Sequence, residues 1–147
     1  MPVLEDMTFN ELLNEFEELP DWGDRCDFLI DLGMEVPRLE ESGRTEENRV
    51  RGCQSNVWMV AGIRKDGGAP FLDIRAESDS MFVNGLIAVL LMVYNGKSPA
   101  EILEIDAEDV FRRLDLHRHL STQRRNGLAG MVQRIRSLAA ETLRKSA

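Results

Sequence analysis

A chain of 147 residues, 43% of them hydrophobic, is long enough to bury a core without disulfide or metal staples, so one domain over residues 1–147 is expected. Two cysteines are too few for a disulfide framework, no stretch has the roughly 18 uninterrupted apolar residues of a membrane span, and the acidic start lacks the features of a signal peptide. The net charge of −8 disfavours nucleic acid, because an acidic surface repels phosphate groups. We therefore expect a cytoplasmic protein with neither a nucleic-acid nor a membrane partner.

The charges are divided unevenly along the chain. Residues 1–47 contain 15 acidic and 3 basic residues, whereas residues 112–147 contain 2 acidic and 9 basic residues. The basic segment has the charge to bind an anionic group locally. Two solvated helix faces that attract each other weakly explain the pattern equally well.

An apolar stripe at helical spacing predicts the first helix. Thr8 and Glu11 have the spacing of a capping box, in which each side chain satisfies a backbone N–H group of the first turn. Pro20 interrupts the helix, which is therefore expected over residues 9–19. The stripe consists of Phe9, Leu12, Leu13 and Phe16.

A second helix is expected directly afterwards. Asp21 can cap it, and Gly33 and Pro37 close it. Cys26 falls among its apolar residues, and an apolar environment is the commonest one for a free cysteine. We therefore expect Cys26 to fill core space.

Two strands joined by a turn are predicted in the middle of the chain. Residues 56–63 are apolar on both alternating faces, which is typical of a central strand. Residues 65–68 have the composition of a hairpin turn, and residues 71–76 alternate between apolar and charged side chains, which predicts one packed and one solvated face. Because Val50 can open a further short strand, we expect an antiparallel sheet of two or three strands.

The most hydrophobic stretch of the chain predicts a buried helix over residues 81–94. The oxygen atoms of residues 78–80 can cap it, and it is apolar almost all round, which is typical of a helix in the middle of a fold. Its length of about 21 Å is too short for a bilayer core of about 30 Å. Gly85 costs about 1 kcal/mol of helix stability relative to alanine, so we expect a sheet or another helix to pass close to it.

Two short helices and a link are expected before a long final helix. Pro99 begins the segment that runs to Ile105, and Asp106 and Asp109 flank the next helix. Residues 116–120 form the link and contain both histidines of the chain.

The final helix is capped by Ser121 and carries Arg124 and Arg125 in its first turn. The helix macrodipole makes cations unfavourable there by a few tenths of a kcal/mol each. A local rule broken without compensation suggests a partner or an anion, and simple exposure to solvent is the alternative.

The stretch over residues 48–58 contains the residue on which the chemistry is expected to depend, Cys53. A cysteine reacts as its thiolate, and a free thiol with a pKa of about 8.5 is mostly protonated at neutral pH, so a reactive one needs positive potential and access. Arg49 and Arg51 supply positive charge, and Gly52 lets a second molecule approach the sulfur.

The residues after Cys53 indicate a loop that leads into a strand. Gln54 and Ser55 are polar and delay the apolar run until Val57. The alternative for Cys53 is a small buried hydrophobe, and its polar neighbours argue against that interpretation.

The residue inventory disfavours several kinds of chemistry. A structural zinc or an iron–sulfur cluster needs about four cysteine or histidine ligands, and Cys26, one of only four such residues, is assigned to a helix face. A dithiol redox protein needs a second cysteine within two or three residues, and a cysteine hydrolase needs an oriented histidine base. A single thiol that takes sulfur from another protein's persulfide and passes it on needs neither a base nor a cofactor.

At these residues the chain resembles the SufE family of sulfur acceptors, together with its relative CsdE, over nearly its whole length. The piece Gly-Cys-Gln-Ser-x-Val-Trp is the most specific part of the resemblance. Thr122 departs from the family, in which many members have proline, and this change concerns helix rigidity only. The matching residues are Leu32-Gly33 with Pro37, Asn48, Val50, Gly52-Cys53-Gln54-Ser55, Val57-Trp58, Ser78-Asp79-Ser80, Gly85-Leu86-Ile87-Ala88, His119-Leu120-Ser121, Arg124, Asn126-Gly127-Leu128 and Met131.

The resemblance implies an α+β fold of the SufE/NifU kind, with a small antiparallel sheet packed against several helices and shared with iron–sulfur scaffold domains. It implies that Cys53 receives persulfide sulfur from a pyridoxal-phosphate cysteine desulfurase of the SufS or CsdA kind and stimulates that enzyme. Iron–sulfur scaffold proteins would then receive the sulfur. No cofactor and no metal site of its own are expected.

The surface that contacts the desulfurase is expected around the loop between Val50 and Asn56 that contains Cys53 (the cysteine loop), the turn at residues 78–80 and the start of the final helix. We also expect the loop to alternate between a position tucked against apolar surface near Trp58 or Met59 and an outward position. A module that activates a desulfurase without carrying sulfur and a cysteine-dependent enzyme are the alternatives. The residues expected to contact the partner are Arg49, Arg51, Gly52, Gln54, Ser55, Asp79 and Arg124.

Overall fold

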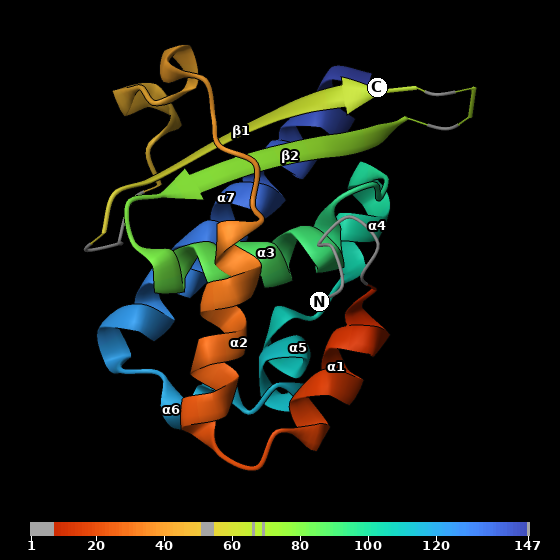
Figure 1. Cartoon of the computed structure of the whole chain (residues 1–147). Helices are drawn as coiled ribbons and strands as arrows, with labels where there is room; N and C mark the ends of the chain where they lie inside the picture. The colour runs from red at the N-terminus through yellow and green to blue at the C-terminus, as the bar shows by residue number, and fades with distance from the viewer. Residues whose placement is uncertain (1–7, 51–54, 66, 69, 147) are drawn as a thin grey trace.

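The computed structural model describes residues 8–50, 55–65, 67, 68 and 70–146 and has an α+β fold, as the sequence predicts (Figure 1). A small sheet lies above the central helix α3, and α1, α2, α5 and α6 lie below it, while α7 passes behind. The described elements are α1 (Phe9–Glu18), α2 (Trp22–Met34), the 3-10 turns η2 (Glu41–Gly43) and η3 (Glu46–Asn48), β1 (Val57–Arg64), β2 (Phe71–Ser78), α3 (Met81–Tyr94), α4 (Pro99–Glu104), α5 (Ala107–Arg113), α6 (Leu116–His119) and α7 (Thr122–Ser146).

The sheet consists of β1 and β2, which pair antiparallel from Val57 opposite Ser78 to Arg64 opposite Phe71. The expectation that β1 is a central strand is wrong for the described residues, because its other edge has only an isolated bridge between Arg49 and Trp58. Its apolar outer face has a different cause: η2 and η3 pack against the strand. The described sheet therefore has two strands, as the expectation of two or three allows, and a folded-over loop lies beside β1 where the sequence allows a further short strand.

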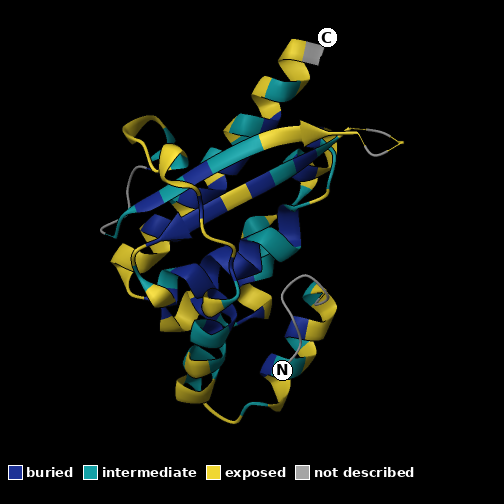
Figure 2. Cartoon of the chain, turned by 45° about the horizontal axis from the view of Figure 1, so that its top comes forward, coloured by how far each residue is buried: buried dark blue, intermediate teal, exposed yellow. Residues whose placement is uncertain are grey.

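Helix α3 forms the centre of the core at the predicted bounds, and most of its residues are buried (Figure 2). The element that passes close to Gly85 is α2, because a Cβ added at Gly85 would overlap the Leu29 carbonyl group. Gly33 has the same relation to α3, since its Cβ would lie 2.7 Å from the Met81 carbonyl oxygen. Helices α2 and α3 thus cross at glycines on both sides, which allows their backbones to touch.

Two asparagine side chains tie α3 to the outer edge of β2. The Asn84 amide accepts a hydrogen bond from Ser78 N at 2.8 Å and donates one to Ser78 O at 3.0 Å, inside the core. Asn95 does the same to Ile74, at 2.8 and 3.4 Å. These amides take the place of a neighbouring strand, so the end of β2 and the turn that follows it are fixed to α3.

The chain after α3 differs from the prediction in one element. The expected link at residues 116–120 contains the single helical turn α6, which begins after Asp115 in the left-handed region, with a φ of 61°. A helix of four residues is too short to give a periodic signal. In the described part of the chain, no helix combines the length and the hydropathy of a membrane span.

Candidate functional site

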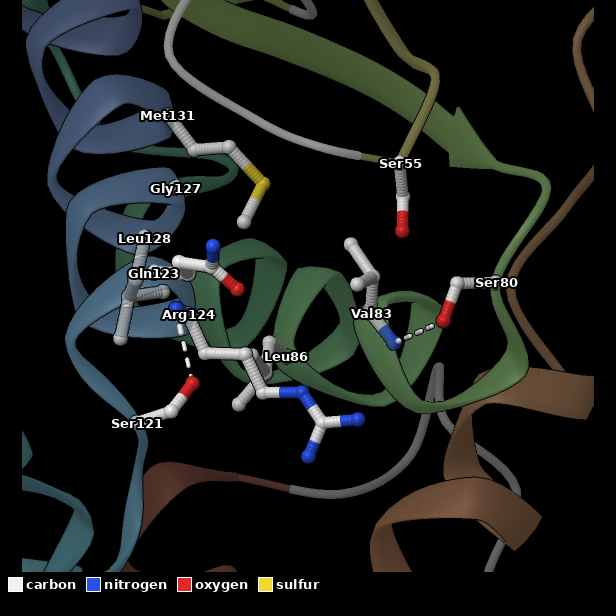
Figure 3. Close-up of a pocket in the computed structure, with 10 residues that line it drawn as sticks. All are labelled: Ser55, Ser80, Val83, Leu86, Ser121, Gln123, Arg124, Gly127, Leu128 and Met131. Atoms are coloured by element: carbon white, nitrogen blue, oxygen red, sulfur yellow. Dashed lines mark hydrogen bonds between the residues drawn. The ribbon is translucent and has the colours of Figure 1, made fainter.

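A cavity of about 280 Å³ lies where the N-terminal ends of α3 and α7 approach the end of the cysteine loop (Figure 3). Ser55 and Ser80 lie on one side of it and the α7 residues on the other. Ser55 follows directly after residues 51–54, so the cavity borders the point where the loop joins the described chain. The lining residues are Ser55, Ser80, Val83, Leu86, Ser121, Gln123, Arg124, Gly127, Leu128 and Met131.

Two of the serines at the rim of the cavity begin the helices that form its walls. Ser80 Oγ accepts a hydrogen bond from Val83 N at 3.4 Å, and Ser121 Oγ accepts one from Arg124 N at 3.2 Å. Both are therefore N-caps, as the sequence predicts. The rim of the cavity is polar, and its walls carry aliphatic and thioether side chains.

Arg124 contributes a positive charge to the lining of this cavity. A contact in the folded chain offsets the unfavourable interaction of this charge with the α7 macrodipole. Its guanidinium carbon lies 4.4 Å from the centroid of the Phe82 ring, a distance typical of a cation–π contact. The sequence did not single out Phe82, which is one of the apolar residues of the helix expected over residues 81–94. No local pattern reveals this contact, because α7 and α3 meet only in the folded chain.

Asp79 clamps the exit of the cysteine loop. Its carboxylate accepts hydrogen bonds from Asn56 N at 3.2 Å and from Asn56 Nδ2 at 2.9 Å, and its own N–H donates to Asn56 O at 3.2 Å. Since Asn56 follows Ser55, these three bonds fix the wall of the cavity next to the loop. The expectation that Asp79 contacts a partner stays a prediction, and the carboxylate also has a role within the chain.

Arg49 lies at the entrance of the same loop, and it does not line the cavity. Its guanidinium is 3.8 Å from a Glu46 carboxylate oxygen, and its backbone bridges to Trp58. Part of its charge is therefore neutralised locally. The other expected residues of this group, Arg51, Gly52, Cys53 and Gln54, lie outside the described residues.

Cys26 lies at the edge of the core close to this site and is half-buried. Burial is the main influence on its thiol and raises its pKa above the ordinary value, Asp27 adds to this effect, and Arg124 and a hydrogen bond with Trp22 oppose it. The Trp22 ring stacks on His119, with 4.4 Å between the centroids. Cys26 thus packs against the edge of the core, and burial disfavours its thiolate form.

Among the described residues, no three histidine, cysteine, aspartate or glutamate side chains are grouped so that they could hold a metal ion. Of the expected partner-contact residues, Ser55 and Arg124 share the cavity, Asp79 adjoins it through Asn56, and Arg49 lies apart.

Comparisons with known proteins agree with the resemblance. A family model described as SufE, Fe-S metabolism associated domain, matches residues 10–139. An uncharacterized SufE-like protein of Rhizobium meliloti is 42% identical over 132 residues, which cover 90% of this chain and 94% of that protein. A second uncharacterized SufE-like protein, from Rhizobium etli, is 41% identical over 132 residues, with coverage of 90% and 89%.

One solved structure has the same fold at low sequence identity. The solution structure of a hypothetical protein from Thermus thermophilus matches with a TM-score of 0.70 and 21% identity, over 93% of this chain and 98% of that one. At this identity the likeness concerns the fold alone.

Proposed function

Since the chain belongs to the SufE family, we propose that it accepts persulfide sulfur on Cys53 from a pyridoxal-phosphate cysteine desulfurase. Family membership gives the chain a role in Fe–S metabolism. Within that role, we assign to it the stimulation of the desulfurase and the relay of sulfur to iron–sulfur scaffold proteins.

One observation supports this proposal above the others: eight of the ten residues that line the cavity belong to the sequence pieces that carry the family resemblance, and only Val83 and Gln123 do not. These pieces come from four separate parts of the chain and meet at the end of the cysteine loop.

Sequence separation limits how far Cys53 can lie from this cavity. Cys53 precedes the lining residue Ser55 by two positions, and two Cα–Cα steps of about 3.8 Å limit the separation of their Cα atoms to about 7.6 Å. The Arg124 guanidinium supplies positive potential at the cavity, and such potential favours the thiolate and the persulfide anion over their protonated forms.

The transfer step needs no group beyond the two sulfur centres. The Cys53 thiolate attacks the outer sulfur of the donor persulfide, a new S–S bond forms at Cys53, and the donor S–S bond breaks. The electron pair leaves with the donor cysteine as a thiolate, and the proton of Cys53 has gone to solvent. One sulfur atom moves with no net oxidation or reduction.

Isotope transfer with two matched variants tests the proposal. Desulfurase supplied with ³⁵S-cysteine should label the wild-type chain and the Cys26→Ser variant equally, and it should leave Cys53→Ser unlabelled. Cys53→Ser should also fail to stimulate the desulfurase. Full stimulation by Cys53→Ser would favour an activator that carries no sulfur, and turnover of a small substrate without desulfurase would favour an independent cysteine enzyme.

A further inference from the structure

Glu77 is a buried carboxylate that the sulfur-transfer step does not use. It is the second-to-last residue of β2, and its side chain is only 6% exposed. Its Oε1 accepts a hydrogen bond from Leu39 N at 2.6 Å, and its Oε2 lies 3.5 Å from Arg38 Nη1 and 3.4 Å from Arg44 Nη1. All three contacts lead to the segment over residues 38–44, which precedes the cysteine loop.

Stability alone does not explain a carboxylate at this position. Removing an ionised group from water costs several kcal/mol, and apolar residues of similar volume often replace buried ion pairs without loss of stability. Buried charges are well suited to fixing one arrangement among several, because any shift of the partner leaves the charge unpaired. The partner here is a segment of irregular structure with only the turns η2 and η3.

Residues at the end of β2 contact the chain on both sides of the cysteine loop. On the entrance side, Glu77 fixes residues 38–44, and Trp58, which pairs with Glu77 across the sheet, bridges to Arg49. On the exit side, Asp79 clamps Asn56 two residues further along. Glu77 and Asp79, which lie close together at the end of β2, therefore hold the chain before and after the cysteine loop.

We propose that Glu77 is a positioning residue: it fixes the segment over residues 38–44, which leads to Val50, the last described residue before Cys53, and thereby sets the rate at which Cys53 takes up sulfur. The inference rests on the proposed function for its consequence in sulfur transfer. Its consequence for the accessibility of the Cys53 thiol is independent of that function.

The test compares Glu77→Gln with Asp73→Asn, both in a Cys26→Ser background in which Cys53 is the sole thiol. Asp73 is a matched control, because it lies on the same strand, and its carboxylate pairs with Arg64 and Arg75 away from the loop. Glutamine keeps an acceptor for Leu39 N and removes the charge. Arg44→Gln removes the cation that faces Glu77 and leaves the carboxylate in place. Because the Arg44 side chain is more exposed than that of Glu77, this variant still tests the contact if Glu77→Gln folds poorly.

Two readouts are taken on folded protein: the rate of Cys53 alkylation by iodoacetamide without a partner, and single-turnover sulfur uptake from persulfidated desulfurase. Glu77→Gln should speed alkylation by about fivefold and slow sulfur uptake by a similar factor. Arg44→Gln should likewise speed alkylation and slow uptake. Asp73→Asn should change neither rate. A lower melting temperature with both rates unchanged would show a merely structural role and overturn the proposal. If the wild-type chain takes up no sulfur, the proposed function fails, and the alkylation rates still decide the role of Glu77.

Discussion

At the scale of single residues, Arg124 occupies an unfavourable position in its helix and is stabilised by a contact with a second helix. The macrodipole disfavours a cation at the start of α7, and the contact with the Phe82 ring offsets that cost. Its neighbour Arg125 shares the unfavourable helix position, but among the described residues its guanidinium bonds within the same helical turn, to Thr122 Oγ1 at 3.4 Å. Arg125 is therefore a matched control for Arg124.

Arg124→Ala should weaken desulfurase binding by about 1 to 3 kcal/mol, which is the range for a charge contact at an interface, and should lower the free energy of unfolding by no more than about 1 kcal/mol. Calorimetric titration with the desulfurase and urea unfolding measure the two quantities. Arg125→Ala should leave binding within about 0.5 kcal/mol of wild type. Equal affinities for all three proteins would move the interface away from the cavity.

The environment of Cys26 predicts a pH dependence that differs from that of an ordinary thiol. Burial raises the pKa of this group, so a smaller fraction of it is thiolate at pH 7 to 8, and its reaction with iodoacetamide should be slower than that of a free cysteine. In the Cys53→Ser variant, where Cys26 is the sole thiol, the midpoint of the pH–rate profile should lie above the ordinary value. A midpoint below that value would contradict this description of the site.

At the scale of elements, the crossing of α2 and α3 depends on the absence of a side chain at Gly85. A methyl group there would overlap the Leu29 carbonyl, which belongs to the backbone and cannot move aside by a change of rotamer. Gly85→Ala should therefore lower the free energy of unfolding by about 2 kcal/mol or more, although alanine is the better helix former. Gly62→Ala serves as control, because nothing lies within 4 Å of its added Cβ, and the change should be within about 0.5 kcal/mol. Urea unfolding in which both variants have wild-type stability would show that the helices do not cross this closely.

The same elements show what the sequence could and could not predict. The apolar run after Ser80 predicted α3 at its observed bounds, and the cost of Gly85 predicted a close neighbour, because both signals are local. The cover of β1 by η2 and η3 was not predictable, since these contacts and the bond between Glu77 and Leu39 join parts of the chain that lie far apart in the sequence. Most residues of the cavity belong to the sequence pieces that carry the family resemblance. That they line a single cavity is visible only in the folded chain.

At the scale of the whole molecule, the fold brings the basic end of the chain against its acidic first part. Arg134 of α7 donates to the Glu47 carbonyl oxygen at 3.2 Å, and Arg124 lies close enough to Cys26 of α2 to influence its pKa. The cavity lies between the end of the sheet and the first half of the basic helix α7.

The mass of the Cys53 peptide tests the central claim most directly. The wild-type chain is incubated with desulfurase and cysteine without reductant, alkylated, digested and analysed by mass spectrometry. The peptide that contains Cys53 should gain about 32 Da, the mass of one sulfur atom, and the peptide that contains Cys26 should gain nothing. Added sulfur found only on Cys26, or on neither cysteine, would contradict the account.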